Sequence, residues 1–159
     1  MANNVCEILL TESLLGMPTR NDGGEAGAMV EFRGMVRRLE DGREIAGIEY
    51  EAHREMAEYQ LKSIAEQATN KFGLKLVTIH HRIGFVAVGE PSLVVAVATP
   101  HRSEGFRAAQ WIVDELKKKV PIWKKPWFNE NIVAGAGDAG HQSKRSGEQP
   151  RSTRPATAS

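Results

Sequence analysis

The sequence predicts an α+β fold in which two helices pack on a mixed sheet. Two segments place apolar residues at helical spacing. Several others alternate apolar and polar residues as strands do, and one run is almost wholly apolar. The chain has 159 residues, which suits one domain and is too short for two well-cored ones. In chain order we expect the elements β-β-β-α-β-β-α.

Three strands are expected before the first helix. Residues 5–10 form a short apolar strand, and residues 28–36 show the alternation of a second one. The pair Asp41-Gly42 is a strong hairpin-turn signal, and residues 45–51 then supply the returning strand.

The first predicted helix covers residues 57–72. Its apolar residues recur three or four positions apart and therefore share one face: Ala57, Leu61, Ile64, Ala65, Ala68 and Phe72. Gly73 is well placed to end this helix. Residues 74–83 alternate again as a strand, and residues 93–99 form a nearly continuous apolar run, which predicts a central strand covered on both faces.

The second predicted helix begins at Ser103, a good N-cap residue, and ends before Pro121. Its expected buried stripe consists of Phe106, Ala109, Val113, Leu116 and Val120. We expect the residues after Pro121, which include two tryptophans, to form a loop.

A change of composition near Ala134 divides the chain into one domain, residues 1–133, and a tail, residues 134–159. The tail contains no Val, Ile, Leu, Met, Phe, Tyr or Trp. Such a segment cannot bury enough apolar surface to offset its ordering entropy, so we expect it to be flexible and disordered.

Composition argues against several functional classes. The 21 Lys and Arg nearly cancel the 20 Asp and Glu, which weakens any role in coating nucleic acid. Cys6 is the single cysteine, which excludes disulfide scaffolds and thiolate zinc clusters. No signal peptide or membrane-spanning stretch is visible. We therefore expect a cytoplasmic protein that binds neither nucleic acid nor membrane and needs no metal or cofactor.

The most unusual local feature is a run of five lysines within nine residues, interrupted by a Pro-Ile-Trp segment. A solvated helix C-terminus, which attracts lysines through the helix dipole, accounts for Lys117 to Lys119. It does not account for Lys124 and Lys125, which follow the proline. A lysine held beside Trp and Ile in an ordered loop is partly desolvated, which suits it to proton transfer or nucleophilic work.

His101 and Arg102 lie where the apolar strand meets the second helix. A helix N-terminus offers free N–H groups and partial positive charge, and these two side chains add donors suited to a phosphate. The alternative is a packed histidine and an arginine paired with Glu104. Arg37 and Arg38, at the end of another strand, suit either a ligand anion or salt bridges within the hairpin.

The histidines do not suggest a metal site. His80 and His81 are adjacent on a predicted strand, so their side chains face opposite sides and cannot easily share an ion. The residues thus favour a site for a phosphorylated ligand in which lysines carry out proton transfer.

Five sequence blocks, in their order and spacing, resemble the MoaE family, the catalytic (large) subunits of molybdopterin synthase. They are Gly-Ala-Met-Val-Glu-Phe-Arg-Gly-Met-Val-Arg at 27–37, Ile-Glu-Tyr-Glu-Ala at 48–52, His-Arg-Ile-Gly at 81–84, His-Arg-Ser at 101–103 and Leu-Lys-Lys-Lys-Val-Pro-Ile-Trp-Lys-Lys at 116–125. The resemblance covers roughly two-thirds of the chain.

The resemblance implies an α/β hammerhead-type fold with a mostly antiparallel sheet, and a homodimer. Each end of the dimer would bind one small ubiquitin-like sulfur-carrier subunit, which makes a heterotetramer. The carrier's C-terminal Gly-Gly thiocarboxylate would donate sulfur to cyclic pyranopterin monophosphate, and two transfers would form the dithiolene of molybdopterin. No catalytic cysteine is needed, because the sulfur arrives on the partner.

Carried over to this sequence, the resemblance makes Lys117 and Lys124 catalytic and makes Arg37, His101 and Arg102 substrate-binding. The other lysines of the run receive no role. The implied function is a sulfurtransferase. The alternative is a non-catalytic module of the same fold that binds a phosphate or nucleotide, or that regulates a partner. The presence of both lysines favours the enzyme.

Overall fold

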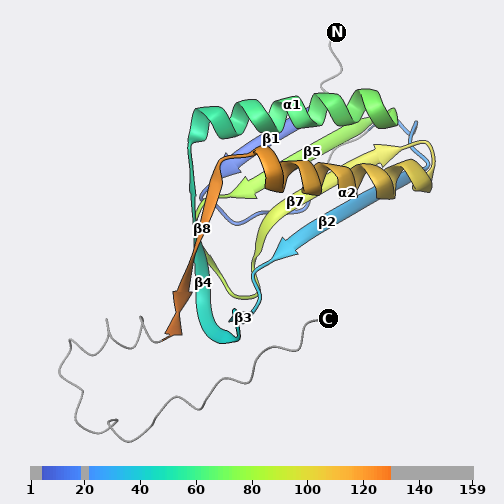
Figure 1. Cartoon of the computed structure of the whole chain (residues 1–159). Coiled ribbons are helices and arrows are strands. Elements are labelled where there is room, and N and C mark those ends of the chain that lie inside the picture. Colours follow the sequence, from blue (N-terminus) through green and yellow to red (C-terminus); the bar gives the residue numbers. More distant parts are fainter. Residues whose placement is uncertain (1–4, 19–21, 130–159) are drawn as a thin grey trace, which may run out of the picture.

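The computed structural model describes residues 5–18 and 22–129. A four-stranded sheet carries two helices on one face, and a smaller sheet adjoins it (Figure 1). The predicted tail, residues 134–159, lies outside the described residues, so the division into domain and tail stays a prediction.

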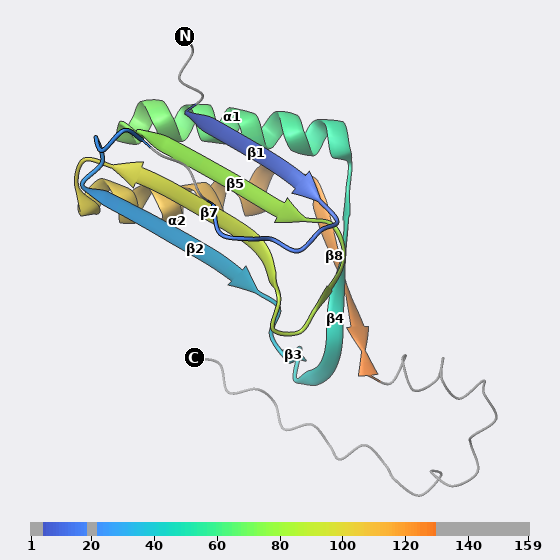
Figure 2. The same ribbon diagram turned by 180° about the vertical axis from the view of Figure 1, so that it is seen from behind.

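The larger sheet has the strand order β1-β5-β7-β2, in which β1 and β5 are parallel and the other neighbours are antiparallel. Its strands are β1 (Cys6–Thr11), β2 (Ala28–Met35), β5 (Leu76–Arg82) and β7 (Pro91–Thr99). The helices α1 (Arg54–Phe72) and α2 (Arg102–Lys119) lie on the same face, as the view from behind also shows (Figure 2). The predicted mixed, mostly antiparallel sheet with two helices is confirmed.

The main core lies between this sheet and the helices. Leu61 and Ile64 of α1 are almost fully buried in it, as the helical spacing predicts. The helix ends at Gly73, whose φ of 65° is a left-handed conformation that glycine adopts without steric cost. In β7 every residue from Ser92 to Thr99 is buried, which confirms the predicted central strand.

The smaller sheet is organised around β4, which pairs antiparallel with each of its three neighbours. Its strands are β3 (Leu39–Glu40), β4 (Arg43–Ala52), β6 (Gly84–Ala87) and β8 (Ile122–Phe128). Asp41 and Gly42 have φ values of 50° and 74°, so the predicted hairpin turn is present. The strand that enters this turn is the short β3, because β2 pairs with β7 instead.

The expected loop after Pro121 was wrong, because Ile122–Phe128 forms β8. This strand pairs along β4 from Ala52, opposite Ile122, to Ile45, opposite Phe128. Pro126 fits here since β8 has β4 as its only described neighbour, and an edge strand tolerates a residue without an N–H donor. The four-residue β6 was not predicted either.

The predicted stripe of α2 is partly wrong at its N-terminal end. Phe106 is 62% exposed, whereas Gly105 is buried so closely that an added Cβ would lie 2.9 Å from Cγ2 of Val30. Because successive helical residues are about 100° apart, burying position 105 turns position 106 outward. The N-cap residue is His101 rather than Ser103, and its side chain makes no capping hydrogen bond.

Neither helix of the described residues has the length and apolar character needed to cross a membrane.

Candidate active site

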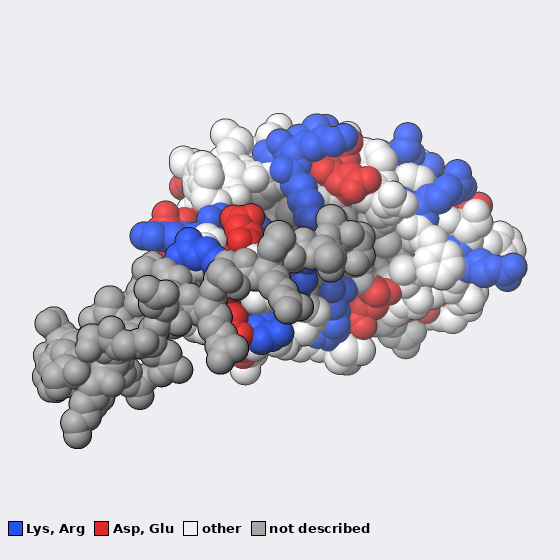
Figure 3. All heavy atoms as spheres, turned by 60° about the horizontal axis from the view of Figure 1, so that its bottom comes forward, with Lys and Arg blue, Asp and Glu red and all other residues white. Residues whose placement is uncertain are grey.

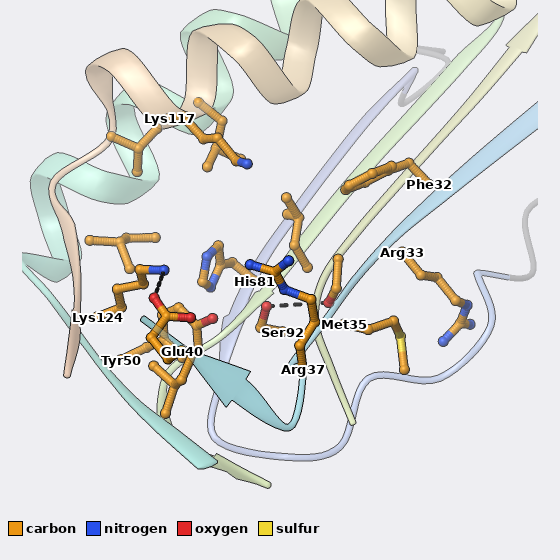
Figure 4. A pocket seen from close by; sticks show the side chains of 16 residues that line it. Phe32, Arg33, Met35, Arg37, Glu40, Tyr50, His81, Ser92, Lys117 and Lys124 are labelled. Atoms are coloured by element: carbon orange, nitrogen blue, oxygen red, sulfur yellow. Dashed lines mark hydrogen bonds and ion pairs between the residues drawn. The ribbon is translucent and has the colours of Figure 1, made fainter. Parts of the chain in front are cut away.

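A pocket of about 680 Å³ lies where the two sheets meet the C-terminal end of α2 (Figure 4). Its wall combines the end of β2 and the turn that follows it with residues of β4, β5, β7 and the α2–β8 connection. These elements are far apart in the sequence, so the pocket exists only in the folded chain. Its size suits a small organic ligand.

Three of the predicted site residues line this pocket: Arg37, Lys117 and Lys124. Arg37 comes from the turn after β2, Lys117 from the last turn of α2 and Lys124 from β8. Lys117 directly follows Leu116, whose buried side chain fixes the orientation of the helix end. The structure therefore brings together both predicted catalytic lysines and one predicted substrate-binding residue. Three cations around one cavity favour an anionic ligand.

A carboxylate that sequence reasoning missed also faces the pocket. Glu40 of β3 accepts a hydrogen bond from Lys124, with 2.6 Å between Oε1 and Nζ. The Glu40 side chain is only 15% exposed, whereas that of Lys124 is 54% exposed. The hairpin salt bridge expected for this segment does form, but between Arg38 and Glu44, at 2.8 Å.

The sequence contains the turn at Asp41-Gly42, which positions Glu40, but only the order of the strands shows that this turn carries Glu40 toward the pocket. β3 pairs with β4, and β4 pairs with β8, so the turn at Asp41-Gly42 carries Glu40 toward Lys124. Because β8 was expected to be a loop, nothing in the sequence connected these two residues.

His81 is a second residue of the pocket wall to which the sequence assigned no role. It is 5% exposed, and its ring meets that of Tyr50 edge-on at 5.3 Å between centroids. Desolvation lowers the pKa of His81 below its ordinary value, and a hydrogen bond to the carbonyl oxygen of Arg82 partly opposes this. His80 points to the other face, where it contacts Glu7 at 2.9 Å, so the two histidines are separated as predicted.

His101 and Arg102 are not in this pocket. They begin α2, while Lys117 is in its last turn, which separates the two groups by about 22 Å along the helix axis. Both residues are exposed, and Glu104, the alternative partner considered for Arg102, lies 3.7 Å from Arg107 instead. A single chain therefore does not bring all five predicted residues around one ligand.

The remaining lysines of the run lie outside the pocket wall formed by the described residues. Lys119 pairs with Glu115 at 2.8 Å, and Lys118 and Lys125 are exposed. Lys125 follows Lys124 on β8, and successive strand residues point to opposite faces. Of these two neighbouring lysines, only Lys124 therefore lines the pocket.

Charges of both signs are interspersed on the face that Figure 3 shows, so this face carries no broad field of one sign. Within residues 5–18 and 22–129, no group of three or more His, Cys, Asp or Glu side chains is placed to hold a metal ion. The chemistry available in the pocket is that of its cations, one carboxylate, one imidazole, one phenol and the hydroxyl of Ser92.

Comparison with known proteins identifies the family. The model of the MoaE protein family matches residues 11–119, more than half of the chain. The molybdopterin synthase catalytic subunit of Thermoplasma volcanium is 42% identical over 101 residues, which cover 64% of this chain and 74% of that protein. The corresponding subunit of Pyrococcus abyssi is 41% identical over 112 residues, 70% of this chain and 76% of that protein.

A solved structure agrees with these sequence matches. The crystal structure of molybdopterin synthase from Staphylococcus aureus superimposes with a TM-score of 0.65 and 32% identity, covering 77% of this chain and 90% of that chain. The matched region includes Arg37, Lys117 and the start of α2, and Lys124 follows it closely. This chain therefore belongs to the MoaE family.

Proposed function

We propose that this chain is the catalytic subunit of a molybdopterin synthase acting in the cytoplasm. It transfers sulfur from the thiocarboxylated C-terminus of a small ubiquitin-like carrier subunit to cyclic pyranopterin monophosphate, and so forms the dithiolene of molybdopterin. The observation that carries this proposal is the convergence of Arg37, Lys117 and Lys124 on one pocket in a MoaE family member.

The electrostatics of the pocket suit both reactants. The substrate carries a phosphate, and the carrier tail ends in a thiocarboxylate, so two anions must come close together. Arg37 offers a planar set of donors for the phosphate. Lys117 and Lys124 offset the charge of the thiocarboxylate and, as protonated amines, donate protons to the reacting groups. A Gly-Gly tail has no side chains, which lets it enter a narrow site.

His101 and Arg102 can act on the substrate only from a second copy of the chain. Their distance from Lys117 along a rigid helix excludes a shared pocket within one chain. We therefore include in the proposal a homodimer in which the start of α2 of one protomer approaches the pocket of the other. With one carrier per pocket the assembly is a heterotetramer.

A non-catalytic phosphate-binding or regulatory module of the same fold is not favoured. The relatives reported above are named catalytic subunits. Both lysines that the family resemblance makes catalytic face the pocket, and a module that only holds an anion does not need the Glu40–Lys124 pair.

The test is reconstitution of the reaction. The purified chain, a thiocarboxylated carrier protein and cyclic pyranopterin monophosphate are combined, and the dithiolene product is measured. The same mixture with the carboxylate form of the carrier is the control, and it should give no product. An active carrier preparation that gives product with a known synthase but none with this chain would overturn the proposal.

A further inference from the structure

The pocket contains one imidazole, that of His81, to which no function has yet been given. Its ring lies between the two sheets, on β5, with Tyr50 of β4 against it (Figure 4). The charged side chains that line the same pocket come from β2, the turn after it, β3, α2 and β8: Arg33, Arg37, Glu40, Lys117 and Lys124. Of these, Arg33 is turned toward the loop before β2, where it donates to the carbonyl of Gly16.

The hydrogen bonding of His81 fixes which ring nitrogen carries the proton. Nδ1 lies 2.7 Å from the carbonyl oxygen of Arg82, and a carbonyl only accepts, so Nδ1 donates its proton there. The neutral ring therefore presents a lone pair at Nε2. Among the described residues, Nε2 has no hydrogen-bond partner. Nε2 is also absent from the unpaired polar atoms that are fully buried, so part of its surface is accessible. Because His81 lines the pocket, we take this accessible surface to face the pocket. Desolvation keeps the ring neutral by lowering its pKa.

The proposed reaction requires a proton acceptor that the other pocket groups do not supply. When the thiocarboxylate sulfur bonds to the substrate carbon and displaces an oxygen substituent there, the carrier becomes attached to the substrate as a thioester. Water must then release the carrier, and its attack is faster when a base takes its proton. Arg37, Lys117 and Lys124 are cations, and Glu40 is engaged with Lys124.

We propose that His81 is the general base that activates this water. This inference rests on the proposed function, since it concerns a step of that reaction. In the step, water oxygen bonds to the thioester carbon while its proton moves to Nε2 of His81. The carbon–sulfur bond then breaks, and the imidazolium returns the proton to the departing sulfur. The products are the carrier with a C-terminal carboxyl group and the substrate with a thiol, so no redox partner is needed.

The structure offers a close pair of variants for the test. In His81→Asn the side-chain amide nitrogen occupies the place of Nδ1 and retains the bond to the Arg82 carbonyl, but no atom remains at Nε2. In the control His80→Asn the neighbouring histidine is changed on the opposite face, where it contacts Glu7.

The assay is a single turnover of wild-type and variant protein with thiocarboxylated carrier and substrate, followed by intact mass spectrometry. We expect His81→Asn to accumulate the covalent carrier–substrate adduct and to release carrier about 10²–10⁴-fold more slowly, the usual contribution of a positioned base. His80→Asn should release carrier as wild type does. Equal release rates for all three proteins would overturn the inference.

A second measurement needs no variant and covers the case in which His81→Asn does not fold. In wild-type protein the adduct should decay more slowly once the pH falls far enough below 6.5 to protonate His81, whose pKa is lowered by burial. A decay rate that stays constant down to the pH at which the chain unfolds would also overturn the inference. Failure of the proposed function is distinguishable, because wild type would then form neither adduct nor product.

Discussion

The two ends of α2 carry similar basic residues in different surroundings. At the C-terminal end, Lys117 faces a pocket enclosed by two sheets and shares it with Arg37 and Lys124. At the N-terminal end, His101 and Arg102 are exposed, as Lys117 is, but neither of them lines this pocket.

The difference shows that a cation forms part of a site when other elements surround it. A helix N-terminus attracts anions through its free N–H groups and dipole, but water screens this attraction at an exposed end. At the other end of α2 the smaller sheet supplies part of a wall, and Lys117 lines the pocket that this wall helps to form. Variants at each end test how far the two ends differ in function. They also test whether dimerisation brings the start of α2 of one protomer to the pocket of the other.

The largest effect is expected at the C-terminal end. Lys117→Ala and Lys124→Ala should each reduce product formation by about 10²–10⁴-fold, since each removes a positioned acid–base group. Lys118→Ala and Lys125→Ala are the matched controls and should remain close to wild type, because these side chains lie outside the pocket wall. Turnover is measured in the reconstituted assay, with carrier binding as a check on folding. Equal mild losses in all four variants would mean that the run acts only as a diffuse positive field.

The next effect concerns the N-terminal end. Arg102→Ala should raise KM about tenfold or more with a smaller change in kcat, because a charge-assisted hydrogen bond to the substrate anion is lost. If Arg102 acts in the pocket of a second copy, mixing Lys117→Ala and Arg102→Ala chains should restore part of the activity. In such a mixed dimer one pocket has both residues intact.

The mixing experiment decides between action within one chain and action across the dimer. Chains are unfolded and refolded together, or exchanged slowly, and turnover is compared with that of each variant alone. No recovery in a sample that contains mixed dimers would show that His101 and Arg102 do not serve the partner's pocket.

A smaller effect is expected for the Glu40–Lys124 pair. Glu40→Gln retains a hydrogen-bond acceptor for Lys124 but removes a negative charge from a pocket proposed to bind anions. We expect KM to fall while kcat falls by about tenfold or less, which corresponds to roughly 1.4 kcal/mol. The double variant with Lys124→Ala should show no additional loss. A fall in kcat with a raised KM would contradict this role of Glu40.

The N-terminal half of α2 also provides a stability test. Gly105→Ala places a Cβ 2.9 Å from Cγ2 of Val30 and should lower the free energy of unfolding by about 1–3 kcal/mol. Phe106→Ala changes an exposed side chain and should alter it by about 0.5 kcal/mol or less. Urea denaturation of the two variants measures both values, and a larger loss for Phe106→Ala would indicate that another surface covers this residue.

The smallest effect is the pH dependence of folding that His81 causes. Its pKa in the folded chain lies below the ordinary 6.5, so the unfolded chain takes up this proton first as the pH falls. Its contribution to stability is therefore complete above pH 6.5 and is lost as the pH falls toward the folded-state value. Denaturation between pH 7.5 and 5 should show this loss in wild type and a smaller one in His81→Asn. The same slope in both would exclude His81 as its origin.

Local sequence patterns were sufficient to predict the parts of the fold that depend on neighbours along the chain. The stripe of α1 and its end at Gly73, the turn at Asp41-Gly42 and the apolar run of β7 follow from local periodicity and backbone preference. The five motif blocks also identified the family, and with it the lysines that the structure places in one pocket.

Tertiary structure alone decided which of these residues meet. β8 is a strand because it pairs with β4. Its own composition does not decide this, because Ile, Trp and Phe favour strands whereas Lys and Pro do not. That pairing brings Glu40 to Lys124, and the packing of the two sheets buries His81 beside Tyr50. The length of α2 then separates His101 and Arg102 from Lys117. The reason is physical: strand pairing and desolvation depend on contacts between distant parts of the chain, which no local pattern encodes.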